Sequence, residues 1–201
     1  MSTKRILEFG GYIAGVVLIV FGVAAIYMGV DGRSTVRDSL KQEQIVFGNA
    51  AEDEAVAKHA KQWSEEQVTT GDQARAFALV MREHTLESSN GLTYAQMGRF
   101  VSAANPDDPA GTSDEAAAAK DENGNPISNG ARNTWVTETA LTTALNMSYM
   151  AEQLSIFGIV VGVALLLAGI GFIILSLLAV RRWALNETEA AAAATNRPAT
   201  A

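Results

Sequence analysis

The chain has 201 residues, no cysteine and a formal net charge of −7 at pH 7. Without cysteine it can hold no disulfide and no thiolate metal site. Residues 31–155 contain 19 acidic and 10 basic side chains, and this acidic balance argues against binding to nucleic acid or to an anionic lipid surface.

The first predicted element is an apolar run at residues 10–30, which contains no charged residue. A bilayer core needs about 20 apolar helical residues to cross it, and lipid offers a non-helical backbone no hydrogen-bond partners. The run therefore predicts a transmembrane helix. A cleaved signal peptide is the competing interpretation, but its apolar core is usually only about 7–15 residues long.

Residues after this run predict short amphipathic helices. The clearest covers 73–88 with Asp72 as its N-cap, and its apolar face at helical spacing consists of Phe77, Val80, Met81 and His84. Thr93 and Gln96 then predict a capping box, which would open another short helix that contains Tyr94.

Residues 103–131 contain three prolines, an alanine run and one large apolar side chain, Ile127. Such a segment buries too little surface to offset the entropy of ordering it, so we expect a flexible insert. Residues 133–153 contain no proline or glycine. They predict a helix that carries Trp135 on its inner face and runs directly into the second apolar run.

The second apolar run, 156–180, again has no charged residue and predicts a second transmembrane helix. The predicted fold is an all-α membrane protein: two antiparallel transmembrane helices with a small helical extracytoplasmic domain inserted between them. Its predicted segments are a cytoplasmic N-terminus (1–9), the first span (10–30), the extracytoplasmic domain (31–155, with the insert at 103–131), the second span (156–180) and a disordered cytoplasmic tail (181–201).

Basic residues at the outer ends of the two runs set the predicted orientation. Lys4 and Arg5 precede the first run, and Arg181 and Arg182 follow the second. Because such residues are retained on the cytoplasmic side of a cell membrane, we expect both termini in the cytoplasm and the middle of the chain outside.

Small residues recur every seven positions in both runs. They are Gly15, Gly22 and Gly29 in the first, and Ser155, Gly162, Gly169 and Ser176 in the second, where Gly158 and Gly162 also form a GxxxG pair. A repeat of seven keeps these residues on one stripe of a supercoiled helix, and small residues let backbones approach closely in lipid. We expect the stripes to pack against each other or against a separate protein. The alternative is that glycine is simply common in membrane helices.

The sequence offers little for catalysis. A non-haem iron site of two histidines and a carboxylate would need His59, His84 and either Glu83 or Glu87, but the histidines lie on different predicted helices at no known metal-binding spacing. We interpret His84 as a half-buried helix residue.

Neither apolar run contains an ionisable residue or an interior proline, which argues against a transporter or channel. We expect no enzyme activity, no metal and no cofactor.

Three stretches carry recurring motifs: STVRDSLKQEQIVF, QVTTGDQARAFALVMREHTLESSNGLTYAQMGRF and ETALTTALNMSYMAEQLSIFGIVVGVALLLAGIGF. They resemble a group of small two-span membrane proteins of actinobacteria, which has V-R-x-x-L-x-x-Q/E-x-I after the first span and then G-x-Q-A-R-A-[FY]-A. The second motif is matched by Gly71, Gln73, Ala74, Arg75, Ala76, Phe77 and Ala78. Members are of unknown function, and some carry a label as aromatic-ring-opening dioxygenases that these residues do not support. The resemblance implies an actinobacterial cell membrane and carries over no catalytic residue.

Three hypotheses of function follow. The favoured one is a non-enzymatic interaction protein, an accessory subunit or assembly factor whose partners are the lipid bilayer and other membrane protein subunits, with no nucleic acid. The second is a small-ligand sensor with a pocket lined by Phe77, Tyr94 and Trp135. The third is an enzyme that uses His84. A candidate interaction surface of the outer domain comprises Phe77, His84, Tyr94 and Trp135.

Overall fold

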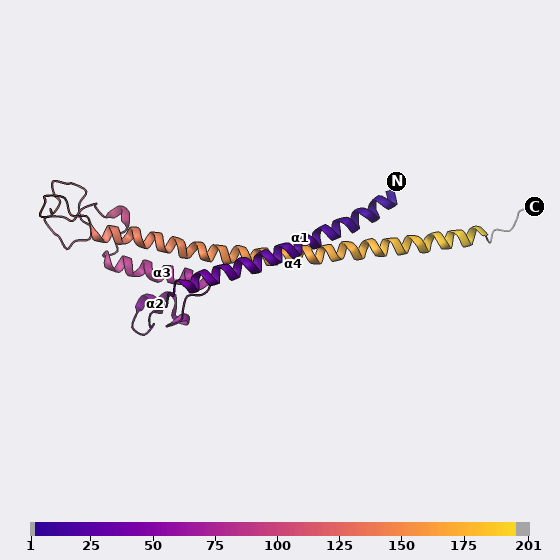
Figure 1. The fold of residues 1–201 in the computed structure, drawn as a ribbon, viewed down its shortest axis with the longest axis horizontal. Helices are drawn as coiled ribbons and strands as arrows, with labels where there is room; N and C mark the ends of the chain where they lie inside the picture. Colours follow the sequence, from indigo (N-terminus) through magenta and orange to yellow (C-terminus); the bar gives the residue numbers. More distant parts are fainter. Residues whose placement is uncertain (1–2, 196–201) are drawn as a thin grey trace, which may run out of the picture. The chain divides into compact units, whose positions relative to one another are not determined.

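The computed structural model describes residues 3–195, which divide into two compact units. The apolar unit consists of the residues up to Asp31 together with those from Leu154 onward, and the polar unit is Gly32–Gln153. The elements, in order, are α1 (Thr3–Gln42), α2 (Glu54–His59), the 3-10 turn η1 (Lys61–Trp63), α3 (Gly71–Ser88), the 3-10 turn η2 (Tyr94–Gln96) and α4 (Gly130–Thr195) (Figure 1). No strand occurs among the described residues, so the predicted helical class is confirmed.

α1 and α4 are long and apolar enough to cross a membrane. In their most apolar windows only 17% and 6% of the residues, respectively, are buried. The core helix of a soluble protein would be covered by other elements, so these exposed apolar surfaces favour a membrane setting. The two apolar helices predicted from residues 10–30 and 156–180 are therefore present.

Close contact between helix backbones holds the apolar unit together. Gly22 of α1 faces Gly162 of α4, and a Cβ atom built on either residue would lie 2.7 Å from the carbonyl oxygen of the other. No side chain fits at that distance, so this approach requires glycine. Gly15 faces Gly169 in the same way, with corresponding distances of 2.8 and 2.6 Å. Two glycine pairs thus set the spacing of the helices.

The other small residues of the apolar unit pack with different closeness. A Cβ atom on Gly29 would lie 2.6 Å from the carbonyl oxygen of Ser155. Ser176 packs against Gly11, which the seven-residue repeat does not include. Gly158 meets only ordinary van der Waals contacts, the nearest at 3.7 Å, so of the GxxxG pair only the second glycine is required by the packing.

The polar unit has its own small apolar core. Phe47 is its aromatic centre, because its ring stacks on Trp63 with centroids 6.1 Å apart and meets the edge of Phe77 at 5.4 Å. Further buried members come from four helices and the loops between them: Leu40, Ala55, Val56, Ala60, Val68, Ala74, Val80 and Leu145. The core therefore ties α1, α2, α3 and α4 into one unit.

Two helix starts differ from the prediction. Thr70, and not Asp72, is the N-cap of α3, since the Thr70 side chain accepts from the backbone N–H of Gln73 and the Gln73 side chain accepts from that of Thr70. This reciprocal box outweighs a lone acidic residue. The box of Thr93 and Gln96 is present but caps only η2, because the backbone turns extended at the next residue. The second amphipathic helix predicted there does not form.

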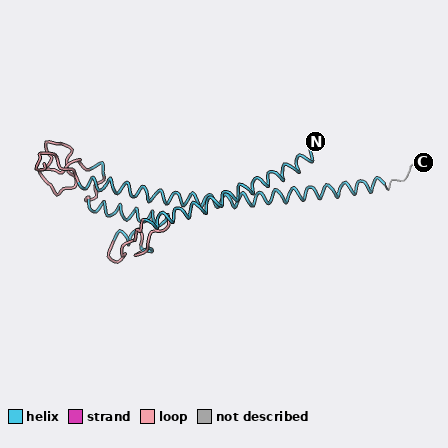
Figure 2. Tube along the Cα trace, viewed as in Figure 1, coloured by secondary structure: helices cyan, strands magenta, loops and turns pink. Residues whose placement is uncertain are grey.

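The predicted flexible insert is a loop with defined backbone hydrogen bonds (Figure 2). Phe100 and Thr112 exchange two of them, at 2.9 and 2.8 Å. The buried side chain of Asn129 donates to the carbonyl oxygens of Gly98 and Pro109 and accepts from the N–H of Ala131, at the start of α4. The insert was expected to be flexible because it has few large apolar side chains. Hydrogen bonds of its backbone order it instead.

α4 continues to Thr195, where the sequence predicts a disordered tail from residue 181. Residues 181–195 contain six alanines, two arginines and two glutamates, all strong helix formers. Low sequence complexity was therefore a wrong guide to disorder over 181–195. The rest of the predicted tail, residues 196–201, and the first two residues of the predicted N-terminal segment lie outside the described residues.

We expect Gly22→Leu to destabilise the apolar unit by about 2 kcal/mol, because the new side chain must push the α4 backbone away. Gly171→Leu is the matched control, since a Cβ atom on this other helical glycine would meet nothing within 4 Å. Unfolding of both purified variants by a denaturing detergent would measure the difference. Equal loss of stability in the two variants would show that the glycine contact is unimportant.

Candidate interaction surface

Glu152 joins three helices of the polar unit. Its side chain is 6% exposed, and its Oε1 accepts a hydrogen bond from Nε of Arg33 on α1 at 2.9 Å, while Nε of Arg37 lies 3.5 Å away. The second carboxylate oxygen accepts the backbone N–H of Gly71, the first residue of α3. One carboxylate of α4 therefore binds two cations and the N-terminus of a helix.

These partners also determine the charge state of Glu152. Burial acts to raise the pKa of its carboxyl group, but the hydrogen bonds from Arg33 and Gly71 and the charge of Arg37 together hold the pKa below its usual value. The folded polar unit therefore stabilises the ionised form of the Glu152 carboxyl group. A general acid needs a raised pKa, so the arrangement is suited to fastening helices and not to proton donation.

Both histidines take part in contacts between α2 and α3. Nε2 of His84 lies 3.0 Å from Oδ1 of Asp53, the N-cap of α2. Nε2 of His59 lies 3.4 Å from Oε2 of Glu83, and Oε1 of the same carboxylate accepts a hydrogen bond from Nζ of Lys58 at 2.8 Å. The histidines thus belong to separate pairs. Within residues 3–195, no group of three or more potential metal ligands comes together.

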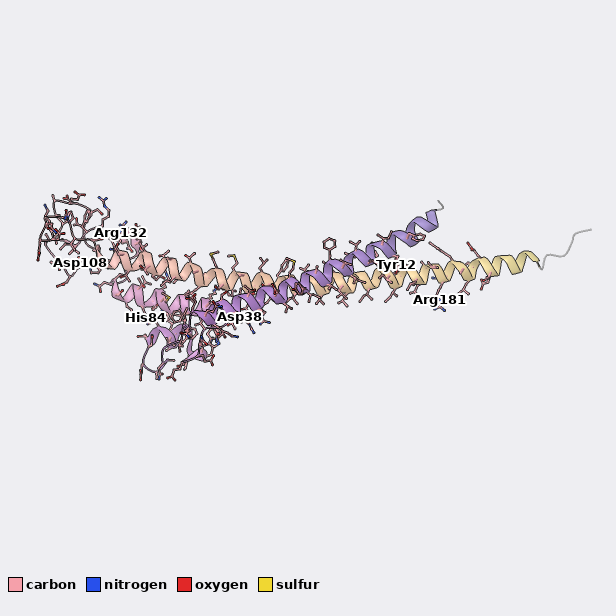
Figure 3. All side chains as sticks on the ribbon, viewed as in Figure 1. Tyr12, Asp38, His84, Asp108, Arg132 and Arg181 are labelled. Carbon is pink, nitrogen blue, oxygen red and sulfur yellow. The ribbon has the colours of Figure 1, made fainter. Side chains whose placement is uncertain are left out.

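The structure separates the four residues of the predicted outer surface. Phe77 is partly buried and packs against the core of the polar unit, where it contacts Phe47. His84 lies on α3 (Figure 3) and its side chain is 47% exposed. Only Tyr94 and Trp135 line the same groove. Phe77 lines a different cavity, together with Leu40 and Leu145, so it does not take part in the groove of Tyr94 and Trp135.

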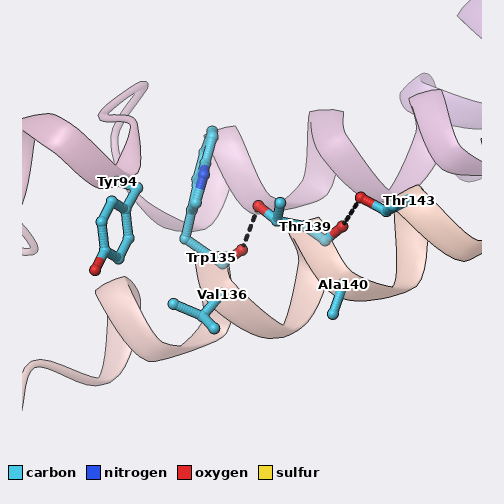
Figure 4. A pocket seen from close by; sticks show the side chains of 6 residues that line it. All are labelled: Tyr94, Trp135, Val136, Thr139, Ala140 and Thr143. Carbon is cyan, nitrogen blue, oxygen red and sulfur yellow. Dashed lines mark hydrogen bonds between the residues drawn. The ribbon is translucent and has the colours of Figure 1, made fainter.

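Tyr94 and Trp135 line a shallow groove of about 530 Å³ along α4, together with Val136, Thr139, Ala140 and Thr143 (Figure 4). The Thr139 hydroxyl donates to the carbonyl of Trp135, and the Thr143 hydroxyl donates to that of Thr139. These hydroxyl protons are therefore used within the helix. The groove offers a mainly apolar lining with no charged residue in it.

A stripe of exposed, uncharged residues runs along α4 from this groove. Its members alternate at spacings of four and three: Val136, Ala140, Thr143, Met147 and Met150. Val136, Met147 and Met150 are 52%, 65% and 69% exposed. This spacing is the one by which helices pack on each other, and contiguous exposed apolar side chains mark interaction surfaces. We call these five residues the α4 stripe.

Sequence reasoning missed the importance of the charged residues of α4. Between residues 133 and 180 the helix carries only two, Glu138 and Glu152, and each is 4% exposed. Carboxylates are rarely buried without partners. Two isolated acids on an otherwise uncharged helix, fourteen residues apart and so at one heptad position, were a signal that the sequence contained.

Comparison with known proteins adds no family to these observations. No protein-family model, curated protein or solved structure matches the chain. The resemblance to small actinobacterial membrane proteins therefore stays a prediction.

We expect Glu152→Gln to lower the stability of the polar unit by about 2 kcal/mol at neutral pH, since an amide cannot neutralise the arginines. The folded pKa of Glu152 lies below its ordinary value of 4.5. Its contribution is therefore fully present above about pH 4.5 and is lost as the pH falls through the folded pKa.

Thermal unfolding between pH 7 and pH 3 would measure this dependence. The wild-type protein should lose more stability on acidification than the Glu152→Gln variant. Glu122→Gln, at an exposed position, is the control and should behave like the wild type. Identical acid sensitivity in all three proteins would contradict the role assigned to Glu152.

Proposed function

We propose that the chain is a non-enzymatic, membrane-anchored interaction protein, an accessory subunit or assembly factor of a larger membrane complex. In this proposal α1 and α4 form an antiparallel transmembrane pair, and the polar unit lies on the extracytoplasmic side of the cell membrane. The basic pairs Lys4–Arg5 and Arg181–Arg182, at the outer ends of the apolar runs, support cytoplasmic termini.

The observation that carries the proposal is the α4 stripe. Exposure of methionine and valine to water does not stabilise the polar unit. A helix of a partner protein would bury these side chains, which is favourable. Methionine suits such a surface because its flexible side chain adapts to different neighbours. The apolar unit adds an anchor without an ionisable group between residues 10 and 30 or between 156 and 180.

The resemblance to small actinobacterial membrane proteins supports the same setting. A respiratory-chain assembly is one natural host for such a subunit. The use of Glu152 and both histidines in contacts between helices supports a structural role over an enzymatic one.

Purification of the tagged full-length protein from native membranes in mild detergent tests the proposal. We expect a membrane protein to co-purify reproducibly in constant proportion, and we expect Met147→Glu combined with Met150→Glu to lower its recovery at least about tenfold. Both positions are exposed, so the substitutions leave the folded polar unit intact while placing charge in a buried contact.

Lys61→Glu is the matched control, because it changes the net charge by the same amount at an exposed position off α4. It should leave the co-purifying protein in place. Recovery of the wild-type chain alone would contradict the proposed function, and so would a partner that the Met147/Met150 variant retains in full.

A further inference from the structure

In the polar unit, α3 and α4 lie side by side (Figure 1). The guanidinium group of Arg75, in the first half of α3, stacks over the ring of Tyr149 at 4.7 Å. That of Arg82, in the second half, stacks over Trp135 at 5.1 Å. The contacts show that the two helices stay together over residues 135–149 of α4.

α1 fills only one end of the groove between these two helices. It ends at Gln42, and its last turns, with Leu40, form one wall of a cavity of about 470 Å³. A neighbouring cavity of about 350 Å³ shares Met81 and Leu141 with the first but has no residue of α1 in its lining. The groove therefore continues past the end of α1 and is open there.

Glu138 lines this open part of the groove, at the heptad position that Glu152 occupies fourteen residues later. Both residues are 4% exposed, but their surroundings differ. Glu152 has Arg33 and Arg37 of α1 and the N–H of Gly71. Oε1 of Glu138 is buried and has no hydrogen-bond partner. Its Oε2 lies 3.4 Å from the hydroxyl of Thr139, which has a closer acceptor in a backbone carbonyl at 2.9 Å.

Two cations of the polar unit stack on aromatic rings, and Nε of Arg132 is also buried without a hydrogen-bond partner. Arg82 stacks over Trp135, and Arg132 stacks over the ring of Tyr94 at 4.0 Å. Neither forms an ion pair with Glu138 within 4.0 Å. A buried carboxylate oxygen without a donor, such as Oε1 of Glu138, is destabilising, and a donor brought from outside would relieve this.

We propose that the groove between α3 and α4 beyond the end of α1 receives a helix of a partner protein that carries a lysine or arginine to Glu138. The inference rests on the proposed function and names the chemistry of the partner. The partner helix would take the place that α1 leaves empty, with apolar side chains on Met81 and Leu141. Its cation would bind Glu138 as Arg33 of α1 binds Glu152.

Photo-cross-linking of the full-length protein in native membranes tests the proposal. The probe is p-benzoylphenylalanine in place of Thr137, an exposed residue of the groove lining. We expect an adduct with a membrane protein whose cross-linked peptide carries a lysine or arginine within one helical turn of the attachment point. Glu138→Gln should lower the adduct yield at least about tenfold, because it removes a buried charge partner. Glu122→Gln removes one acid at an exposed position instead and should leave the yield unchanged.

The purified protein provides a second, independent measurement. Because no cation of the described residues pairs with Glu138 and its Oε1 has no hydrogen-bond partner, Glu138→Gln should leave the melting temperature unchanged or raise it, in contrast to Glu152→Gln. Arg82→Ala should not reproduce the effect of Glu138→Gln on the adduct. A melting temperature that falls in Glu138→Gln as far as in Glu152→Gln would show an internal partner and overturn the proposal.

Three further results would overturn it: an adduct with a second copy of this chain, a cross-linked peptide without a basic residue, or an adduct yield that Glu138→Gln does not change. Failure of the proposed function is distinguishable, since it is the absence of any co-purifying protein with the wild-type chain. A partner that stays bound through the α4 stripe in Glu138→Gln would refute the groove and leave the proposed function intact.

Discussion

Apolar side chains that point outward along most of two helices are stable only in apolar surroundings. In α1 and α4 this constraint decides where charge is placed, because residues 10–30 and 156–180 contain none. It also explains the glycine pairs of the apolar unit. Lipid is as apolar as leucine, so two helices gain little from burying large side chains against each other. Close backbone contact, as between Gly22 and Gly162, brings many atoms into van der Waals range instead.

In the polar unit the problem is reversed, because charged groups must be kept stable within a small core. The buried charge of Glu152 is stabilised by several partners, since its carboxylate binds Arg33, Arg37 and the start of α3. Glu138 has the same burial without such partners. We propose that another molecule completes the surface around Glu138, and the exposed apolar area of the α4 stripe supports the same proposal.

Local patterns in the sequence predicted the elements that depend on local forces. Charge-free runs predicted the two apolar helices, and spacing of apolar residues predicted α3. The seven-residue repeat selected Gly15, Gly22, Gly162 and Gly169, which the structure brings together in pairs. Asp72 was wrong as an N-cap because two neighbouring residues, Thr70 and Gln73, form a better box.

Features that depend on distant residues could not be predicted in this way. Arg33 and Glu152 are 119 positions apart, and no local pattern joins them. The loop from Gly98 to Asn129 is held by backbone bonds between segments that composition alone describes as unstructured. The candidate surface was predicted from aromatic residues, but Phe77 packs against the core. Trp135 and Tyr94 share a groove only because η2 folds back onto α4.

Single-cysteine labelling can show on which side of the membrane each part of the chain lies, because the chain has no native cysteine. Glu87→Cys lies at an exposed position of the polar unit and Asn186→Cys at an exposed position beyond the second apolar run. A membrane-impermeant maleimide added to intact cells should modify Glu87→Cys, and should reach Asn186→Cys only after the membrane is permeabilised. Modification of Asn186→Cys in intact cells, or protection of Glu87→Cys, would contradict a chain that crosses the membrane twice with its polar unit outside.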